Sequence, residues 1–151
     1  MKDSDAETRS NSAYLWGILA QNSSVGAYSF YPEALQLLAG LFTDNSGVPN
    51  LLDNAAAAVA RMSIAGATLV PLPQVLPALL KSVPLRKDFQ ENEAVYKCIF
   101  ELVKTANPAV SLTFVDLLTF ARLRQILLEF CLLLPSLLDI KMCNKKFKLR
   151  L

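Results

Sequence analysis

A recurring helical pattern, repeated about every 40 residues, constrains the fold of this chain more than any other feature of its sequence. Asn11, Asn54 and Asn92 align, and the spacings between them are 43 and 38 residues. Relative to each asparagine, an alanine stands two positions later, a small residue six positions later and a large apolar residue eight positions later. The aligned sets are Ala13, Ala56 and Ala94; Gly17, Ala60 and Cys98; and Leu19, Met62 and Phe100.

A second pattern lies between these segments. YPEALQLLAGLF (31–42) aligns with LPQVLPALLKSV (72–83) at a spacing of 41 residues, which places Pro32 over Pro73. Proline in the first helical turn has a suitable fixed φ and lacks a donor that would be unpaired there anyway. A period near 40 with two helices per unit is typical of HEAT and armadillo repeats. We expect the small residues to let neighbouring helices approach closely and the large ones to fill the space between layers.

The sequence therefore predicts an all-α HEAT-repeat α-solenoid, with stacked antiparallel helix pairs forming a segment of a right-handed superhelix. The alternative is an unrelated helical bundle with a chance alanine periodicity. Repeats are expected over 1–110, a divergent leucine-rich helical segment over 111–140 and a basic tail over 141–151. Asp53 and Asp88 are expected to precede helices and cap them. The predicted helices are 5–21, 32–42, 50–65, 73–82, 89–106, 112–123 and 124–139.

Composition argues against an enzyme. The chain has no histidine, which removes the commonest general base and metal ligand. Cys98, Cys131 and Cys143 are far apart and form no CxxC pair, so we expect free thiols in a reducing compartment and no metal or cofactor. GILAQNSSVG (17–26) lacks the GK[ST] ending of a phosphate loop. The polar, charged N-terminal segment is not a secretory signal.

The net charge of +2 divides into two unlike parts. Residues 141–151 hold five basic residues and no acid, whereas residues 1–140 hold 10 basic and 13 acidic residues. A disordered tail is the favoured interpretation, and contact with nucleic acid or anionic lipid and a localisation patch are the alternatives. The apolar run 126–138 has 13 residues, against the roughly 20 needed to cross a bilayer, and it includes Glu129 and Pro135. We therefore expect this run to be a helix packed on the last repeat and not a membrane span.

Four segments together resemble HEAT repeats of the importin-β (karyopherin) family. They are DAETRSNSAYLWGILAQNSS, FYPEALQLLAGLF, LLDNAAAAVARM and LPQVLPALLKSVPLRKDFQENEAVYKCIFELVKTANPAV, within about residues 3–110. The resemblance implies a nuclear transport receptor near the C-terminal end of its superhelix, with A helices on the convex face and B helices on the concave face. It also implies basic cargo such as histones or ribosomal proteins on an acidic concave surface, nucleoporin repeats between outer helices, and Ran in its GTP form on N-terminal repeats.

Transferred to this chain, the resemblance makes 5–21, 50–65 and 89–106 the B helices. Carboxylates and amides at their exposed early positions could bind Lys- and Arg-rich cargo through charge-assisted hydrogen bonds. The alternative is that these residues cap helices and form ladders between repeats. The candidate cargo-binding residues are Asp5, Glu7, Asn11, Asp53, Asn54, Glu91, Asn92 and Glu93.

The sequence also departs from the family pattern. The chain is much shorter than family members, begins at a B helix without an A partner, and loses the resemblance after about Val110. A replaced C-terminus and a membrane anchor are two interpretations of that change, and the Ran site is expected to be absent. The expected function is that of a receptor fragment that binds protein cargo for nuclear import, located in cytoplasm and nucleus. The alternatives are a HEAT-repeat scaffold without a transport role and a truncated product without function.

Overall fold

The computed structural model describes residues 1–105 and 107–113, and within these ranges it contains α-helices and no β-strand. Short 3-10 turns connect several helices: η1 (Ser24–Phe30), η2 (Ala67–Leu69) and η3 (Phe89–Glu91). The expected all-α class is confirmed. The helices are α1 (Ala6–Asn22), α2 (Tyr31–Leu41), α3 (Pro49–Ala65), α4 (Leu72–Lys81), α5 (Asn92–Lys104) and α6 (Pro108–Thr113).

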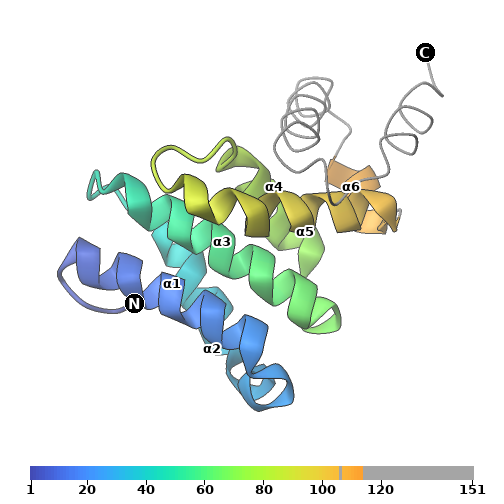
Figure 1. Cartoon of the computed structure of the whole chain (residues 1–151), viewed down its shortest axis with the longest axis horizontal. Coiled ribbons are helices and arrows are strands. Elements are labelled where there is room, and N and C mark those ends of the chain that lie inside the picture. Colours follow the sequence, from blue (N-terminus) through green and yellow to red (C-terminus); the bar gives the residue numbers. More distant parts are fainter. Residues whose placement is uncertain (106, 114–151) are drawn as a thin grey trace.

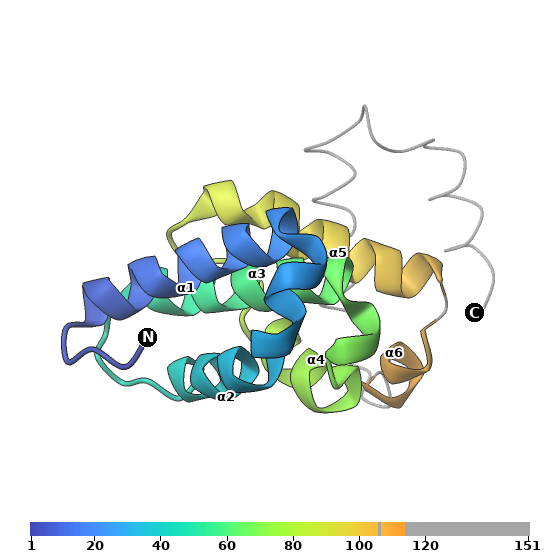
Figure 2. The same ribbon diagram turned by 90° about the horizontal axis from the view of Figure 1, so that it is seen from below.

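The helices form two layers, which are seen edge-on in Figure 2. Helices α1, α3 and α5 lie side by side in one layer, and α3 contacts both of its neighbours (Figure 1). Helices α2, α4 and α6 form the other layer, in which α4 packs against α6. Each helix of the second layer follows one of the first along the chain, which is the packed-pair arrangement of a HEAT-repeat protein. The right-handed superhelix stays a prediction.

Proline marks the helix starts as expected. Pro49 is the first residue of α3, and Pro32 and Pro73 are the second residues of α2 and α4. The predicted helix 89–106 begins instead with the 3-10 turn η3, and regular α-helix starts at Asn92. The short helix α6 starts at Pro108, earlier than the predicted 112–123. The remainder of that prediction, the helix 124–139 and the basic tail lie outside the described residues.

Small residues let α1 and α3 approach each other closely. A Cβ atom added to Gly17 would lie 2.9 Å from the Cα of Ala58, which is closer than side chains tolerate. The facing run Ala55–Ala58 and the aligned Ala13, Ala56 and Ala60 are all fully buried. The expectation that small residues bring the helices together is therefore confirmed for this pair.

The aligned large residues behave less uniformly than expected. Met62 is fully buried, and its sulfur accepts a hydrogen bond from the Trp16 indole N–H at 3.2 Å. Leu19, expected to fill space between layers, is 48% exposed, so this prediction is wrong. Helix α1 packs against α3 through its small residues, such as Ala13 and Ala20. Leu15 and Leu19 lie outside this contact and remain exposed.

Cys98 is a buried free thiol on α5, as expected. Burial raises the pKa of this thiol to about 12, so it stays protonated and unreactive at neutral pH. Cys131 and Cys143 lie outside the described residues. Among the residues described, no helix has both the length and the apolar character needed to cross a membrane.

The contact at Gly17 predicts opposite effects for two glycine-to-alanine substitutions. Gly17→Ala should lower the free energy of unfolding by about 1–3 kcal/mol, because the new methyl group meets the α3 backbone. Gly40→Ala, at an exposed position of α2 where nothing lies within 4 Å of the added Cβ, should raise it by about 0.5–1 kcal/mol. Urea unfolding followed by circular dichroism measures both. Equal effects of the two substitutions would contradict the proposed close approach.

Candidate functional site

The layer made of α1, α3 and α5 carries all eight candidate residues, but the structure divides them into two groups. Asp5, Glu7, Asn11 and Glu93 are exposed and Asn92 is half-buried, near the starts of α1 and α5. The other three, Asp53, Asn54 and Glu91, are buried, so their expected exposure is wrong. Helix α3 lies between two neighbours, and its early positions therefore face other helices and the 86–88 segment.

The Asp53 carboxylate binds the main chain of a segment far away in sequence. It accepts hydrogen bonds from the N–H groups of Arg86 at 3.1 Å, Lys87 at 2.8 Å and Asp88 at 2.9 Å. Asp53 therefore does not cap its own helix, which begins at Pro49. The Asp88 side chain makes no capping bond to the turn that follows it. The capping prediction for Asp53 is wrong, because its carboxylate binds the main chain of the next repeat. Asp88 does precede η3 as expected, but its side chain does not cap that turn.

Polar side chains also connect the three helices of this layer. Asn54 donates to the Ser10 hydroxyl at 3.0 Å. The Arg61 guanidinium donates to both carboxylate oxygens of Glu91 and, through Nε, to Gln21 at 2.9 Å. We call these five residues the polar ladder. It fits the alternative interpretation of Asn54 and Glu91 as residues of a ladder between repeats.

Arg61 was not among the candidates, although the sequence held a signal for it. It stands in the apolar stretch AVARMSIA, and a charged residue in a buried helix must have a partner. Arg61 is only 9% exposed. Its guanidinium donates hydrogen bonds to Gln21 at the end of α1 and to Glu91 at the end of η3. Arg61 on α3 thus connects α1 with the 3-10 turn η3, which leads directly into α5.

Asp5 combines a local structural role with exposure. It is the N-cap of α1 and accepts from the Thr8 hydroxyl and the Thr8 N–H, both at 2.7 Å. The hydrogen bond from the Thr8 side chain is the main cause that lowers the pKa of Asp5 below its usual value. The carboxylate therefore stays ionised at neutral pH and remains open to solvent.

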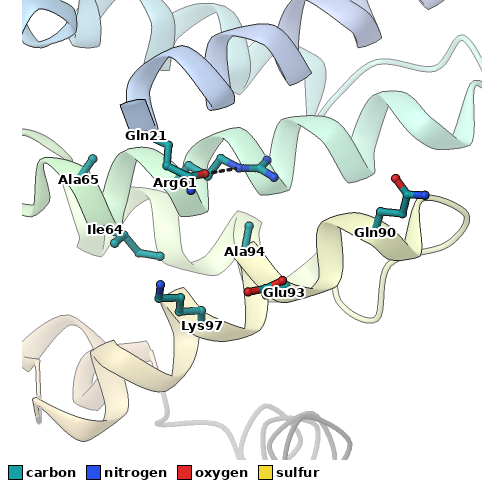
Figure 3. A pocket seen from close by; sticks show the side chains of 8 residues that line it. All are labelled: Gln21, Arg61, Ile64, Ala65, Gln90, Glu93, Ala94 and Lys97. Atoms are coloured by element: carbon teal, nitrogen blue, oxygen red, sulfur yellow. Dashed lines mark hydrogen bonds between the residues drawn. The ribbon is translucent and has the colours of Figure 1, made fainter. Parts of the chain in front are cut away.

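A groove of about 290 Å³ lies between the C-terminal end of α1, the second half of α3 and the start of α5 (Figure 3). Ile64, Ala65 and Ala94 give it an apolar surface, while polar and charged side chains stand around it. The latter are Gln21, Arg61, Gln90, Glu93 and Lys97. Of these lining residues only Glu93 was a sequence candidate, because the groove joins three segments that are far apart in the chain.

The chemistry of this groove is that of a binding surface. Amides of Gln21 and Gln90 can donate and accept hydrogen bonds, and Glu93 can bind a cationic side chain. Within residues 1–105 and 107–113, no group of three or more His, Cys, Asp or Glu residues could hold a metal ion. The exposed charges near the groove carry both signs, since Lys97 follows Glu93 by one helical turn.

No family model matches the chain, but several curated proteins are similar to it. It is 36% identical to the probable importin subunit beta-4 of Schizosaccharomyces pombe over 110 residues, which are 73% of this chain and 10% of that protein. It is 37% identical to human importin-4 over 90 residues, which are 60% of this chain and 8% of that protein. The mouse importin-4 is 33% identical over 90 residues, with the same shares of both chains.

The chain thus spans about a tenth of the length of the relatives it matches, and it is homologous to a part of these importins. This homology confirms the resemblance to the importin-β family. It also supports the expectation of a non-enzymatic protein, because importins are transport receptors.

Asp53→Asn should destabilise the fold strongly. The amide places a donor where the carboxylate accepted from three N–H groups, and the expected loss in free energy of unfolding is about 2–4 kcal/mol. Asp88→Asn makes the same chemical change in the same segment without a capping bond to lose, and should cost less than about 0.5 kcal/mol. Chemical denaturation compares the two variants. A loss at Asp53 no larger than that at Asp88 would refute the assigned role.

The Arg61–Glu91 pair should show strong coupling in a double-mutant cycle. Arg61→Met and Glu91→Met each leave a buried charge unpaired and should each cost about 3–5 kcal/mol. The double variant should cost clearly less than the sum, because no charge is stranded. Urea denaturation of the four proteins gives the coupling free energy, and additive losses would argue against the buried pair.

Proposed function

We propose that this chain, a relative of the importin-β transport receptors over part of their length, forms a segment that binds protein cargo for nuclear import. The observation that carries the proposal is the identity of 36% to the probable importin subunit beta-4 over 110 residues. The proposal places the protein in cytoplasm and nucleus. Nucleoporins and Ran are proposed partners of the full receptor, and cargo is the partner proposed for this segment.

We assign cargo binding to the exposed face of the α1, α3 and α5 layer. Glu7 and Glu93 are exposed on this face, and Gln21 and Gln90 add amides beside Glu93 in the groove. Carboxylates recognise Lys and Arg side chains through charge-assisted hydrogen bonds, and amides can bind the peptide groups between them. Basic proteins of the histone or ribosomal type have this chemistry. The buried Asp53, Asn54 and Glu91 are left out of the proposed contact surface, because the two carboxylates and the NH2 group of Asn54 bind other parts of the fold.

Charge reversal on the proposed face tests this assignment. The double variant Glu7→Lys/Glu93→Lys should bind purified core histones about tenfold more weakly than the wild-type chain, because two attractive contacts become repulsive. The single variants Glu7→Lys and Glu93→Lys should each weaken binding as well, and Glu33→Lys is their matched control, since it reverses one exposed charge on α2 in the opposite layer. Biolayer interferometry at two salt concentrations measures the affinities, and added salt should weaken wild-type binding.

Two results would count against the proposal. Absence of any salt-sensitive binding to basic proteins would contradict the cargo class. Equal loss in the Glu33→Lys control would show that total charge, and not the face, controls binding. A stable partner whose binding is independent of salt and of both glutamates would favour the scaffold function instead.

A further inference from the structure

A second groove lies at the opposite end of α3 from the groove of Glu93. It occupies about 470 Å³ between the connection from α2 to α3 and the segment that precedes α5. Leu41, Phe42, Val48 and Leu52 supply its apolar lining, and Arg86 and Lys87 stand on its other side. We call it the basic groove. It shares no lining residue with the first groove.

The two cations of the basic groove are available for an external partner. Arg86 and Lys87 are exposed, and their main-chain N–H groups are held by Asp53. In the part of the chain that the structure describes, neither side chain has an ion-pair or hydrogen-bond partner. The groove therefore presents two positive charges on a fixed backbone.

The carboxylate that lines the basic groove is already neutralised. Asp44 forms an ion pair with Arg9 at 2.7 Å and accepts a hydrogen bond from the Ser46 N–H at 2.7 Å. The hydrogen bond with Ser46, followed by that with Arg9, lowers the pKa of Asp44 below its usual value. The ion-pair partner of Asp44 is thus Arg9 of α1, and the salt bridges within the described residues do not join Asp44 to Arg86 or Lys87.

The apolar part of the groove is only partly covered. Phe42, Val48 and Leu52 are half-buried, and an inserted apolar side chain would remove more of their surface from water. Gly47 has a positive φ of 74° at the turn beside Val48, a backbone conformation that favours glycine. The turn thus gives the groove a defined edge.

From this arrangement we propose that the basic groove docks a short acidic segment of a partner protein, with one aromatic or aliphatic side chain against Phe42 and Leu52 and its carboxylates on Arg86 and Lys87. Charge complementarity selects this occupant, because the groove combines an apolar lining with two exposed cations. The charge preference is opposite to that of the Glu7 and Glu93 face. The inference therefore does not rest on the proposed binding of basic cargo.

Fluorescence polarisation with the full chain and a fluorescein-labelled peptide GEEFEEG tests the proposal. Wild-type protein should bind it saturably, and Arg86→Glu/Lys87→Glu should weaken binding by more than about tenfold. This variant should stay folded, because Asp53 binds the main chain and not these side chains. Lys81→Glu/Lys104→Glu is the matched control, since it reverses two exposed lysines that line neither groove and should bind nearly as tightly as wild type.

Two further probes separate this docking from general attraction of anions. The peptide GEESEEG should bind clearly more weakly, because it lacks the apolar side chain. A single-stranded oligonucleotide of equal charge should not compete. Absence of saturable peptide binding, equal binding to both charge-reversal variants, equal binding of GEESEEG, or competition by the oligonucleotide would each overturn the proposal.

Discussion

The buried carboxylate of Asp53 determines where the later part of the described fold lies. Its oxygens hold the N–H groups of Arg86, Lys87 and Asp88, so α3 fixes the segment that leads into η3 and α5. A fully buried carboxylate is costly without partners, and hydrogen bonds to an ionised acceptor are the strong kind that offsets this cost. Through this contact Glu91 reaches the position where Arg61 binds it.

The alanine-rich contact between α1 and α3 needs such polar contacts to have a single register. Methyl groups of Ala55–Ala58 pack closely but without direction, and neighbouring alanines are nearly equivalent to one another. A hydrogen bond from Asn54 to Ser10 and one from Arg61 to Gln21 can form in only one alignment of the two helices. We infer that the alanine contacts allow α1 and α3 to approach closely, and that the polar ladder fixes their alignment along the helix axes.

Within the described residues the sequence predicted the helices up to α5 well, because proline positions and the period of about 40 residues are signals that the sequence itself carries. It failed for Asp53, Asn54 and Glu91, which were expected on the surface. Periodicity along one helix does not tell whether a polar face meets water or another repeat, and α3 has neighbours on two sides. Both grooves were also hidden, because each is built from segments that are distant in sequence.

The two grooves at opposite ends of α3 differ in charge for a reason that lies in the backbone. Near the start of α3, the N–H groups of residues 86–88 all donate to the Asp53 carboxylate. The side chains of Arg86 and Lys87 remain exposed. At its other end, Arg61 is neutralised by Glu91, and the exposed charges there are Glu93 and Lys97, which offset each other. The fold near the basic groove thus depends on main-chain hydrogen bonds to Asp53, and near the first groove on the buried Arg61–Glu91 pair. The exposed charges of both grooves can therefore vary without loss of the fold, which is what selection for different partners requires.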